Sequence, residues 1–377
     1  MTRAAERWDA IVVGASFAGL AAAMELAGHG RVLLLDKDAI GDNQTSACAT
    51  PLAVLERLEL LESLEQVHEA LVLHLPGGIA RTYPFAYPFA TFDYRRLCQL
   101  LAARTDATFR RAWVRTVDGD RVVSSEGAYS APVVIDASGW RCVLGSTVEP
   151  GLRGVATRSI GLEAGLPWQS EPRVPSRRGA ADGPAQGLHF WVADELARDG
   201  YLWDFPAGAE HRVGLLRYRS GGGLKPRLRG FLGRDAEPEE LHGGVLPSRF
   251  RAPSAGSVFL VGDAAGQCLP LSGEGIRPAL VFGQLAGRLA AQVLDGDLPL
   301  EAALDRYRRL ARGPQRKYQL LALIERSMHR LPRRPMDAVS WYFGAGPLSR
   351  YCQDAYWRIA PAEWLRPGAV ASPARPS

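Results

Sequence analysis

Two glycine-rich turns carry residue types suited to binding phosphates and sugars. The first spans 13–19 (VGASFAG), follows an apolar run and opens a helix-like stretch. Gly14 permits a tight turn, Ser16 is small enough for the backbone to meet a pyrophosphate, and Gly19 lets the helix pack on the strand. The free amides at the helix N-terminus attract that anion. Asp36 ends the next predicted strand about twenty residues later, where a carboxylate can accept hydrogen bonds from a ribose.

The second turn spans 262–276 and reads GDAAGQCLPLSGEGI. After a strand-like run, the Asp263 carboxylate can accept hydrogen bonds from a polyol such as the ribityl chain of a flavin. The loop then opens a second helix, whose N-terminal amides can face the flavin edge that becomes negative on reduction. The two turns together predict one bound FAD. The contacts expected from the second turn are Gly262, Asp263, Gly273, Gly275 and Ile276.

The elements that must position these turns alternate between strand-like and helix-like patterns. Leucine spacing also predicts a helix over 51–70, and the middle of the chain reads as strands with glycine- and proline-rich links. We expect an α/β fold: a Rossmann-type FAD-binding domain with an inserted β-sheet substrate domain and a helical C-terminal segment. The predicted boundaries are 1–150 with 250–300 for the FAD domain, 151–249 for the inserted domain, and 301–377 for the C-terminal segment.

Two stretches give the chain a family resemblance. Residues 262–283 resemble the second flavin motif of the geranylgeranyl reductase family, within the wider superfamily of para-hydroxybenzoate-hydroxylase-like flavoproteins. The run YLWDFP at 201–206 resembles the Y-x-W-x-F-P segment of that family, which lines the substrate cavity. The family's trailing G-x-G is here Gly214 followed by two leucines. The resemblance implies a substrate cavity lined by Tyr201, Trp203, Phe205 and Pro270.

Further positions are read through the same resemblance. Cys48 stands where the family carries a cysteine, although its neighbours differ, and with Glu274 it is our catalytic candidate. The helix start at 94–97 resembles the region that sets an arginine, here Arg95, against the FAD phosphates. Ser138 replaces an aspartate that assists NAD(P)H binding in the hydroxylases. The variant is similar to the segment of flavin-dependent halogenases, but Lys37 is misplaced for their catalytic lysine.

Three functions follow from these features. The main hypothesis is an FAD-dependent oxidoreductase that reduces C=C bonds of an apolar, isoprenoid-like small molecule, with NAD(P)H or a partner flavin reductase as electron source. The alternative is a flavin-dependent monooxygenase of secondary metabolism, a hydroxylase or epoxidase, and less favoured still a halogenase-like enzyme. A flavoprotein chaperone or sensor without turnover is the third class.

Composition excludes several other classes. The chain has 377 residues, 47% hydrophobic and 23% charged, with a net charge of +5 and no recognised nucleic-acid module. Five cysteines without C-x-x-C spacing predict neither a metal site nor a disulfide framework. No apolar run approaches the ~18 residues of a membrane helix, so we expect a cytoplasmic protein. The segment 306–334 holds ten basic residues and one acid, which fits either a peripheral contact with anionic lipid, a pyrophosphate-bearing substrate, or a solvated helical face.

Overall fold

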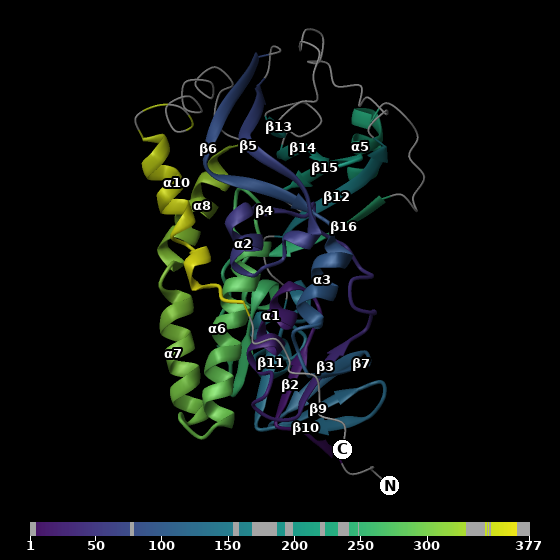
Figure 1. The fold of residues 1–377 in the computed structure, drawn as a ribbon, viewed down its shortest axis with the longest axis vertical. Helices are drawn as coiled ribbons and strands as arrows, with labels where there is room; N and C mark the ends of the chain where they lie inside the picture. The colour runs from purple at the N-terminus through teal and green to yellow at the C-terminus, as the bar shows by residue number, and fades with distance from the viewer. Residues whose placement is uncertain are drawn as a thin grey trace.

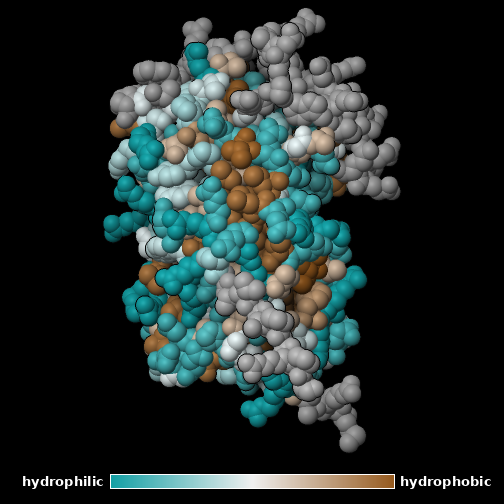
Figure 2. All heavy atoms as spheres, in the orientation of Figure 1, coloured by the Kyte–Doolittle hydropathy of each residue, from teal (hydrophilic) through white to brown (hydrophobic). Residues whose placement is uncertain are grey.

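The computed structural model describes residues 5–75, 79–153, 158–167, 187–192, 199–218, 223–232, 241–247, 249–328, 344, 346 and 348–367. Figure 1 shows two parts stacked along the long axis. The lower part holds the two smaller sheets and the long helices, and the upper part holds an eight-stranded sheet. Apolar side chains on the face drawn in Figure 2 gather near its middle, where Figure 1 draws α2 and β4.

The lower part is built on a six-stranded sheet. Its order is β17-β18-β11-β2-β3-β7, and every pair is parallel except β17 with β18. Strands of a parallel sheet buried on both faces are apolar throughout, as in the AIVV run of β2. The strands are β2 (Ala10–Val13), β3 (Val32–Asp36), β7 (Thr108–Arg111), β11 (Val133–Asp136), β17 (Ser254–Ala255) and β18 (Val258–Leu260).

Alternate side chains of this sheet enter two different cores. One face packs against helices and the other against a four-stranded sheet of order β1-β10-β9-β8. These covering elements are α1 (Phe17–Glu25), α3 (Tyr94–Ala102), α6 (Ile276–Leu294), α7 (Leu300–Arg312), β1 (Glu6–Arg7), β8 (Val114–Asp118), β9 (Arg121–Ser124) and β10 (Ala128–Ser130). Strands β8 and β9 form an antiparallel hairpin that turns at residues 118–121.

Glycines bring α1 and α6 into backbone contact. A Cβ on Gly283 would lie 2.4 Å from the Ala18 carbonyl oxygen, and one on Gly287 would lie 2.5 Å from that of Ala22. Any larger side chain would push the helices apart. The two turns that open these helices are 248 residues apart in sequence (14 and 262), yet this packing sets them side by side.

The upper part is the eight-stranded sheet of order β16-β12-β15-β14-β13-β5-β6-β4. Its neighbours are antiparallel except β13 and β5. Helix α5 (Leu224–Leu232) covers one face, and aromatic side chains project from the other. The strands are β4 (Ala49–Pro51), β5 (Leu64–Leu75), β6 (Ile79–Phe92), β12 (Arg158–Pro167), β13 (Leu188–Val192), β14 (Gly200–Ala207), β15 (Glu210–Arg217) and β16 (Leu241–Pro247).

The helix predicted over 51–70 is wrong beyond its first turns. The structure has α2 (Leu52–Arg57), a short 3-10 turn η1 (Leu61–Ser63), and then β5. Strand β5 pairs with both β6 and β13, and these long-range contacts override the local leucine spacing. The division predicted at residue 150 therefore differs from the sheet, since β4, β5 and β6 join strands of 158–247.

The described residues after 300 lie mainly in helices, so the predicted α/β class with a helical C-terminal segment is confirmed. Helices α8 (Gln315–Met328) and α10 (Ser349–Trp357) lie beside the upper sheet at the left of Figure 1. Among the described residues, no helix has the length and apolar character to cross a bilayer. The remaining short helices are α4 (Gly145–Val148), η2 (Gly139–Arg141), η3 (Pro150–Leu152), η5 (Gly262–Ala265) and η6 (Ala362–Trp364).

Candidate cofactor and substrate site

One cavity of about 1040 Å³ joins the two glycine turns to the aromatic face of the upper sheet. Its size is at the upper end of ligand pockets, which are about 300–1,000 Å³. Most of the residues predicted from sequence meet in its wall. They are Gly14, Ser16, Asp36, Cys48, Tyr201, Trp203, Phe205, Gly262, Asp263, Gly273, Glu274, Gly275 and Ile276. Three predicted residues, Gly19, Arg95 and Pro270, are not in that wall.

The first turn connects β2 to α1. Gly14 has φ +107°, and a Cβ there would lie 2.2 Å from the Ala137 carbonyl oxygen, so only glycine fits. Ser16 precedes the helix without capping it through its side chain, and its hydroxyl accepts a hydrogen bond from Tyr94. The first-turn amides of α1 are left to a ligand, which suits a diphosphate. Gly19 serves packing instead, since a Cβ there would lie 1.7 Å from the Gly14 oxygen.

Asp36 lies at the end of β3, beside the first turn. Its carboxylate accepts hydrogen bonds from the Ala15 amide at 2.6 Å and from the Asp38 amide at 3.0 Å. The lone pairs that remain face the cavity and suit a ribose diol. Arg95 is instead 61% exposed and pairs with Asp42 at 3.0 Å, outside the cavity wall.

The second turn connects β18 to α6, and it touches the first. A Cβ on Gly262 would lie 2.9 Å from that of Ala18 in α1. The Asp263 carboxylate faces the cavity, and no hydrogen-bond partner is found for it in the described part of the chain. Burial raises the pKa of this carboxyl to about 6. A desolvated acceptor without a partner suits the hydroxyls of a polyol, and the uncapped N-terminus of α6 suits an anionic ring edge.

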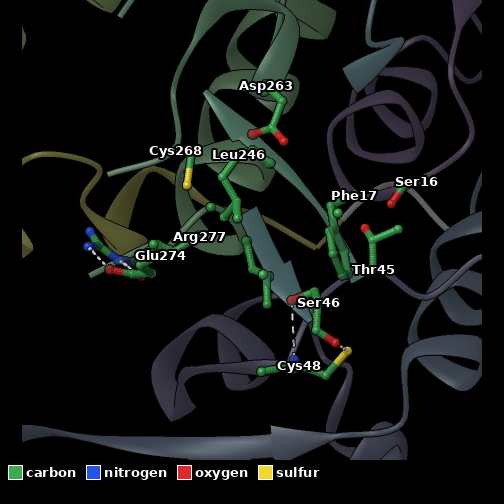
Figure 3. Close-up of a pocket in the computed structure, with 18 of the residues that line it drawn as sticks. Ser16, Phe17, Thr45, Ser46, Cys48, Leu246, Asp263, Cys268, Glu274 and Arg277 are labelled. Carbon is green, nitrogen blue, oxygen red and sulfur yellow. Dashed lines mark hydrogen bonds and ion pairs between the residues drawn. The ribbon is translucent and has the colours of Figure 1, made fainter. Parts of the chain in front are cut away.

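The Glu274 carboxylate is engaged in a buried ion pair with Arg277. Its two oxygens accept hydrogen bonds from Arg277 at 2.7 and 2.8 Å (Figure 3). Arg277 also donates to the carbonyl oxygens of Trp357 and Ala360 at 3.0 and 2.6 Å. This network ties the loop before α6 to the end of α10 and to the residues that follow it, so Glu274 is better placed for positioning than for proton transfer. Pro270 lines a separate small pocket.

Cys48 lies just before β4 in a strained conformation with φ +53°. Its thiol points at the Ser46 carbonyl oxygen, 3.3 Å away, and burial raises its pKa well above the ordinary value. The thiol therefore stays protonated and is a poor nucleophile. Figure 3 draws Cys48 and Asp263 on opposite sides of Leu246.

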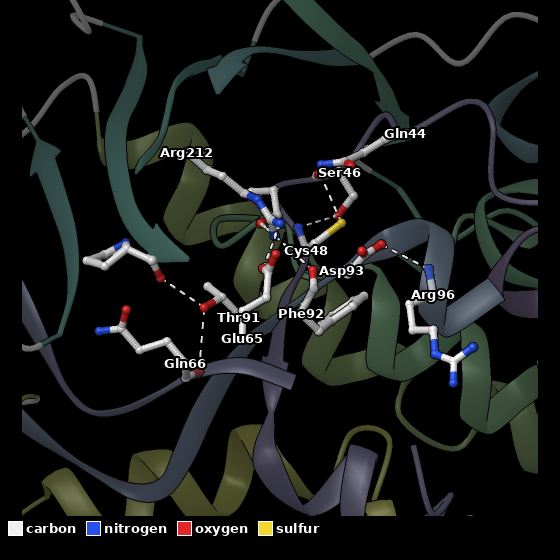
Figure 4. Close-up of polar contacts among 12 residues, drawn as sticks. Gln44, Ser46, Cys48, Glu65, Gln66, Thr91, Phe92, Asp93, Arg96 and Arg212 are labelled. Carbon is white, nitrogen blue, oxygen red and sulfur yellow. Dashed lines mark hydrogen bonds and ion pairs between the residues drawn. The ribbon is translucent and has the colours of Figure 1, made fainter. Parts of the chain in front are cut away.

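Polar side chains behind Cys48 fix this end of the cavity (Figure 4). Arg212 donates to the Phe92 carbonyl oxygen at 2.9 Å and to Glu65 at 2.7 Å. Because Arg212 sits on β15 and Glu65 on β5, the pair ties two distant strands of the sheet together. The sequence offered no motif for this pair.

The aromatic wall comes from β14, whose alternate residues Tyr201, Trp203 and Phe205 share one face of the sheet. The Tyr201 hydroxyl donates to the Ser272 carbonyl oxygen and so joins this wall to the second turn. The Trp203 indole N–H donates to Glu163 at 2.7 Å. Glu163, a buried carboxylate on the cavity wall, was missed from sequence, because a lone acid in an apolar strand has no motif.

The segment after β11 forms a closed network. Asp136 accepts hydrogen bonds from the amides of Ser138, Leu144 and Gly145 at 2.8–2.9 Å, and burial still raises the pKa of its carboxyl. The Ser138 hydroxyl accepts one from the Val143 amide at 2.7 Å. Ser138 thus lines the cavity with its oxygen engaged inside the protein.

The sequence was compared with those of known proteins and protein families. No protein-family model matches the chain. It is 32% identical over 165 residues to a digeranylgeranylglycerophospholipid reductase of Methanosarcina acetivorans, which covers 40% of each chain. It is 28% identical over 227 residues to digeranylgeranylglycerophospholipid reductase 2 of Methanothermobacter thermautotrophicus, covering 57% of this chain and 58% of the relative. The chain therefore aligns with less than two thirds of either relative.

Solved structures match over nearly the whole chain. A geranylgeranyl bacteriochlorophyll reductase-like protein from Thermoplasma acidophilum has a TM-score of 0.77 at 17% identity, covering 96% of this chain and 98% of that one. A probable FAD-dependent monooxygenase, PqsL, from Pseudomonas aeruginosa has a TM-score of 0.65 at 17% identity, covering 89% and 99%. At such identities the likeness shows the fold. The sequence matches and the fold match together confirm the resemblance of this chain to geranylgeranyl reductase-like proteins.

Proposed function

We propose that this chain is an FAD-dependent oxidoreductase that saturates C=C bonds of an apolar, isoprenoid-like small molecule. The observation that carries the proposal is the single cavity that runs from the turn residues Gly14 and Asp263 to the aromatic wall at Trp203. The curated relatives named digeranylgeranylglycerophospholipid reductase support the same reading.

The residues of both turns fit FAD. Gly14, Ser16 and the first amides of α1 would hold the diphosphate, and Asp36 the adenosine ribose. Asp263 would accept from the ribityl hydroxyls, and the N-terminus of α6 would face the pyrimidine edge. When bound and reduced, FAD supplies the hydride for such a reaction. NAD(P)H or a partner flavin reductase would supply its electrons.

The wall opposite the turns fits an apolar substrate. Tyr201, Trp203 and Phe205 project from β14, and Phe85 and Phe89 of β6 add two further rings. Aromatic faces bury an isoprenoid chain without leaving unpaired polar groups. The Tyr201 hydroxyl donates a hydrogen bond to the Ser272 carbonyl oxygen, so it does not present an unpaired polar group to the isoprenoid chain of the substrate.

A flavin-dependent monooxygenase is the second candidate. Ser138, in the place of the hydroxylase aspartate, lines the cavity and favours a supply of electrons from a separate reductase. A halogenase is disfavoured because Lys37 pairs with Asp38 beside the ribose end, rather than at the aromatic wall.

Anaerobic mixing separates these candidates. FAD-loaded protein is reduced with dithionite and mixed with geranylgeraniol in detergent, and flavin absorbance is followed. We expect reoxidation by the alkene in the absence of oxygen. A flavin hydroperoxide spectrum on mixing with O2 and a phenol, together with no alkene-dependent reoxidation, would favour the monooxygenase. Protein that takes up no FAD would reject both.

We also propose a peripheral contact with anionic lipid through the outer face of α8. Leu320 and Leu323 are 57% and 59% exposed, and Arg316 and Arg326 flank them on the same face. Apolar anchors beside cations suit a bilayer that carries negative headgroups. Helix α8 packs on α10, whose inner face reaches the cavity wall at Tyr356.

Vesicle sedimentation tests this contact. The protein should sediment with phosphatidylglycerol vesicles and far less with phosphatidylcholine alone. The double variant Leu320→Ser, Leu323→Ser should lose at least half of the bound fraction, whereas Leu61→Ser, another exposed leucine (49%), should bind as wild type. Equal binding by both variants would contradict the assignment to α8.

A further inference from the structure

We propose that Glu163 donates a proton to the substrate in the cavity and that His242 reloads it from solvent. This inference rests on the proposed reduction of a C=C bond, which needs a proton for the second carbon. The geometry that points to it is a row of side chains across neighbouring strands of the upper sheet.

The row is fixed by strand register. Glu163 of β12 lies opposite His242 of β16 on one side and Gly214 of β15 on the other. Trp203 of β14 lies opposite the same Gly214. A Cβ on Gly214 would lie 2.0 Å from the Trp203 Cζ2 atom, so the glycine lets the indole cross β15. The trailing glycine of the aromatic motif thus has a physical role: it allows Trp203 to reach Glu163.

The partners of Glu163 leave it able to exchange a proton. Its carboxylate accepts from the Trp203 indole at 2.7 Å and lies 2.9 Å from the His242 Nε2 atom. No arginine or lysine pairs with it in the described part of the chain. By contrast, Arg277 fixes the charge of the cavity carboxylate Glu274. A buried carboxylate held by an imidazole can share one proton with it.

Burial changes along the row in the direction that proton delivery needs. Glu163 is 2% exposed and lines the cavity. The His242 side chain is 32% exposed, on strand β16 at the edge of the sheet. Protons can therefore enter from solvent at His242 and reach the cavity through Glu163, while the apolar wall excludes bulk water.

Other ionisable groups near this end of the cavity are less suited. The Cys48 thiol has a pKa raised by burial, which makes it a weak acid. Arg212 is paired with Glu65 and donates to a backbone carbonyl.

Reduction of the C=C bond adds a hydride to one carbon and a proton to the other, and the proton comes from the Glu163 carboxyl group. When bound and reduced, FAD would supply the hydride for one alkene carbon and the two electrons that go with it. The Glu163 O–H bond breaks as its proton forms the C–H bond on the other carbon. The resulting carboxylate takes a proton from the His242 imidazolium, and the neutral imidazole takes one from water.

The first test follows the anaerobic reoxidation of the reduced, FAD-loaded protein by the alkene. Glu163→Gln should slow alkene-dependent reoxidation by about 100-fold or more, the usual contribution of a general acid. Ferricyanide, which takes electrons without a substrate proton, should reoxidise this variant at the wild-type rate. Glu25→Gln, which replaces a half-buried carboxylate that pairs with Arg288 on the far helices, is the matched control and should keep the wild-type rate.

A second variant keeps the proposal testable if Glu163→Gln does not fold. His242→Gln should slow reoxidation, and added imidazole should restore it, because the site is open to solvent. A role in positioning Trp203 alone would give no rescue by imidazole.

A chemical probe tests the carboxyl group without the flavin. Dicyclohexylcarbodiimide reacts with carboxyl groups in apolar surroundings, and mass spectrometry should find it on Glu163. Geranylgeraniol in the cavity should protect the group. If wild type is reoxidised by the alkene but Glu163→Gln reacts equally fast, or if Glu163 stays unlabelled, the inference fails. If no alkene reoxidises wild type while Glu163 is labelled, the proposed reduction fails and the proton path stands.

Discussion

Replacement of Asp263 by asparagine should stabilise the flavin-free protein and weaken its hold on FAD. The carboxyl faces a cavity, has no hydrogen-bond partner in the described residues, and has a pKa raised from 3.8 to about 6 by burial. The free-energy cost of ionising it in the folded state is therefore about 3 kcal/mol, at about 1.36 kcal/mol per pKa unit. Asparagine is similar in shape and carries no charge.

The pH dependence follows from this raised pKa. Below about pH 3.8 the group is protonated in both folded and unfolded chains and costs nothing. Between pH 3.8 and about 6 it ionises first in the unfolded chain, so the folded state loses stability as the pH rises. Above pH 6 the loss is complete. The advantage of Asp263→Asn should therefore grow from near zero at pH 4 to about 3 kcal/mol at pH 8.

Urea unfolding of the flavin-free proteins at pH 4, 6 and 8 measures this advantage. The same proteins are then titrated with FAD at pH 8, following flavin fluorescence. A hydrogen bond to a charged group contributes about 1.5–3 kcal/mol, so Asp263→Asn should weaken FAD binding about 10- to 100-fold.

The control is Asp136→Asn, which removes a buried carboxylate that already accepts three backbone amides. This variant should lose stability at every pH, because amides of Leu144 and Gly145 lose an acceptor. If Asp263→Asn is no more stable than wild type at pH 8, or if it binds FAD as tightly, the role assigned to this carboxylate is refuted.

Two further predictions concern packing around the cavity. Gly214→Ala should displace the Trp203 indole, which should lower the thermal midpoint by several degrees and change the tryptophan fluorescence. The control is Gly165→Ala, whose Cβ would touch only a flexible carboxylate at 3.4 Å, and it should leave the thermal midpoint and the fluorescence unchanged. Glu274→Gln should cost about 3–5 kcal/mol in urea unfolding, because it leaves Arg277 buried without its anion, and a cost below 1 kcal/mol would contradict the buried pair.

The sequence predicted that residues of two glycine-rich turns would come together, and they line one cavity. Gly14, Gly262 and Asp263 belong to turns between a strand and a helix, and Asp36 is the last residue of strand β3. Such turns are local, since their requirements for φ, for small side chains and for helix amides are written in a few consecutive residues. All four positions meet in one cavity wall.

Other assignments needed information that sequence lacks. Pro270 and Arg95 are close in sequence to residues that line the cavity, but Pro270 lines a separate small pocket and Arg95 pairs with Asp42 in an exposed position. From the sequence, Glu274 is a candidate acid. The structure shows that it is paired with the buried Arg277, which also donates hydrogen bonds to two carbonyl oxygens of the C-terminal segment. The strand β5 was read as helix because its leucine spacing is ambiguous without the strands beside it.

The sequence by itself determined that two glycine turns of flavin-binding type exist and that aromatic residues alternate at 201–205. Only the tertiary structure decided that these meet in one cavity, and that Glu163 in its wall lies beside His242 at the edge of the sheet. The physical reason is the range of the interactions. A turn is specified by its own residues, whereas strand register and helix–helix contact at Gly283 join residues up to 265 positions apart (18 and 283), and no local pattern encodes such pairings.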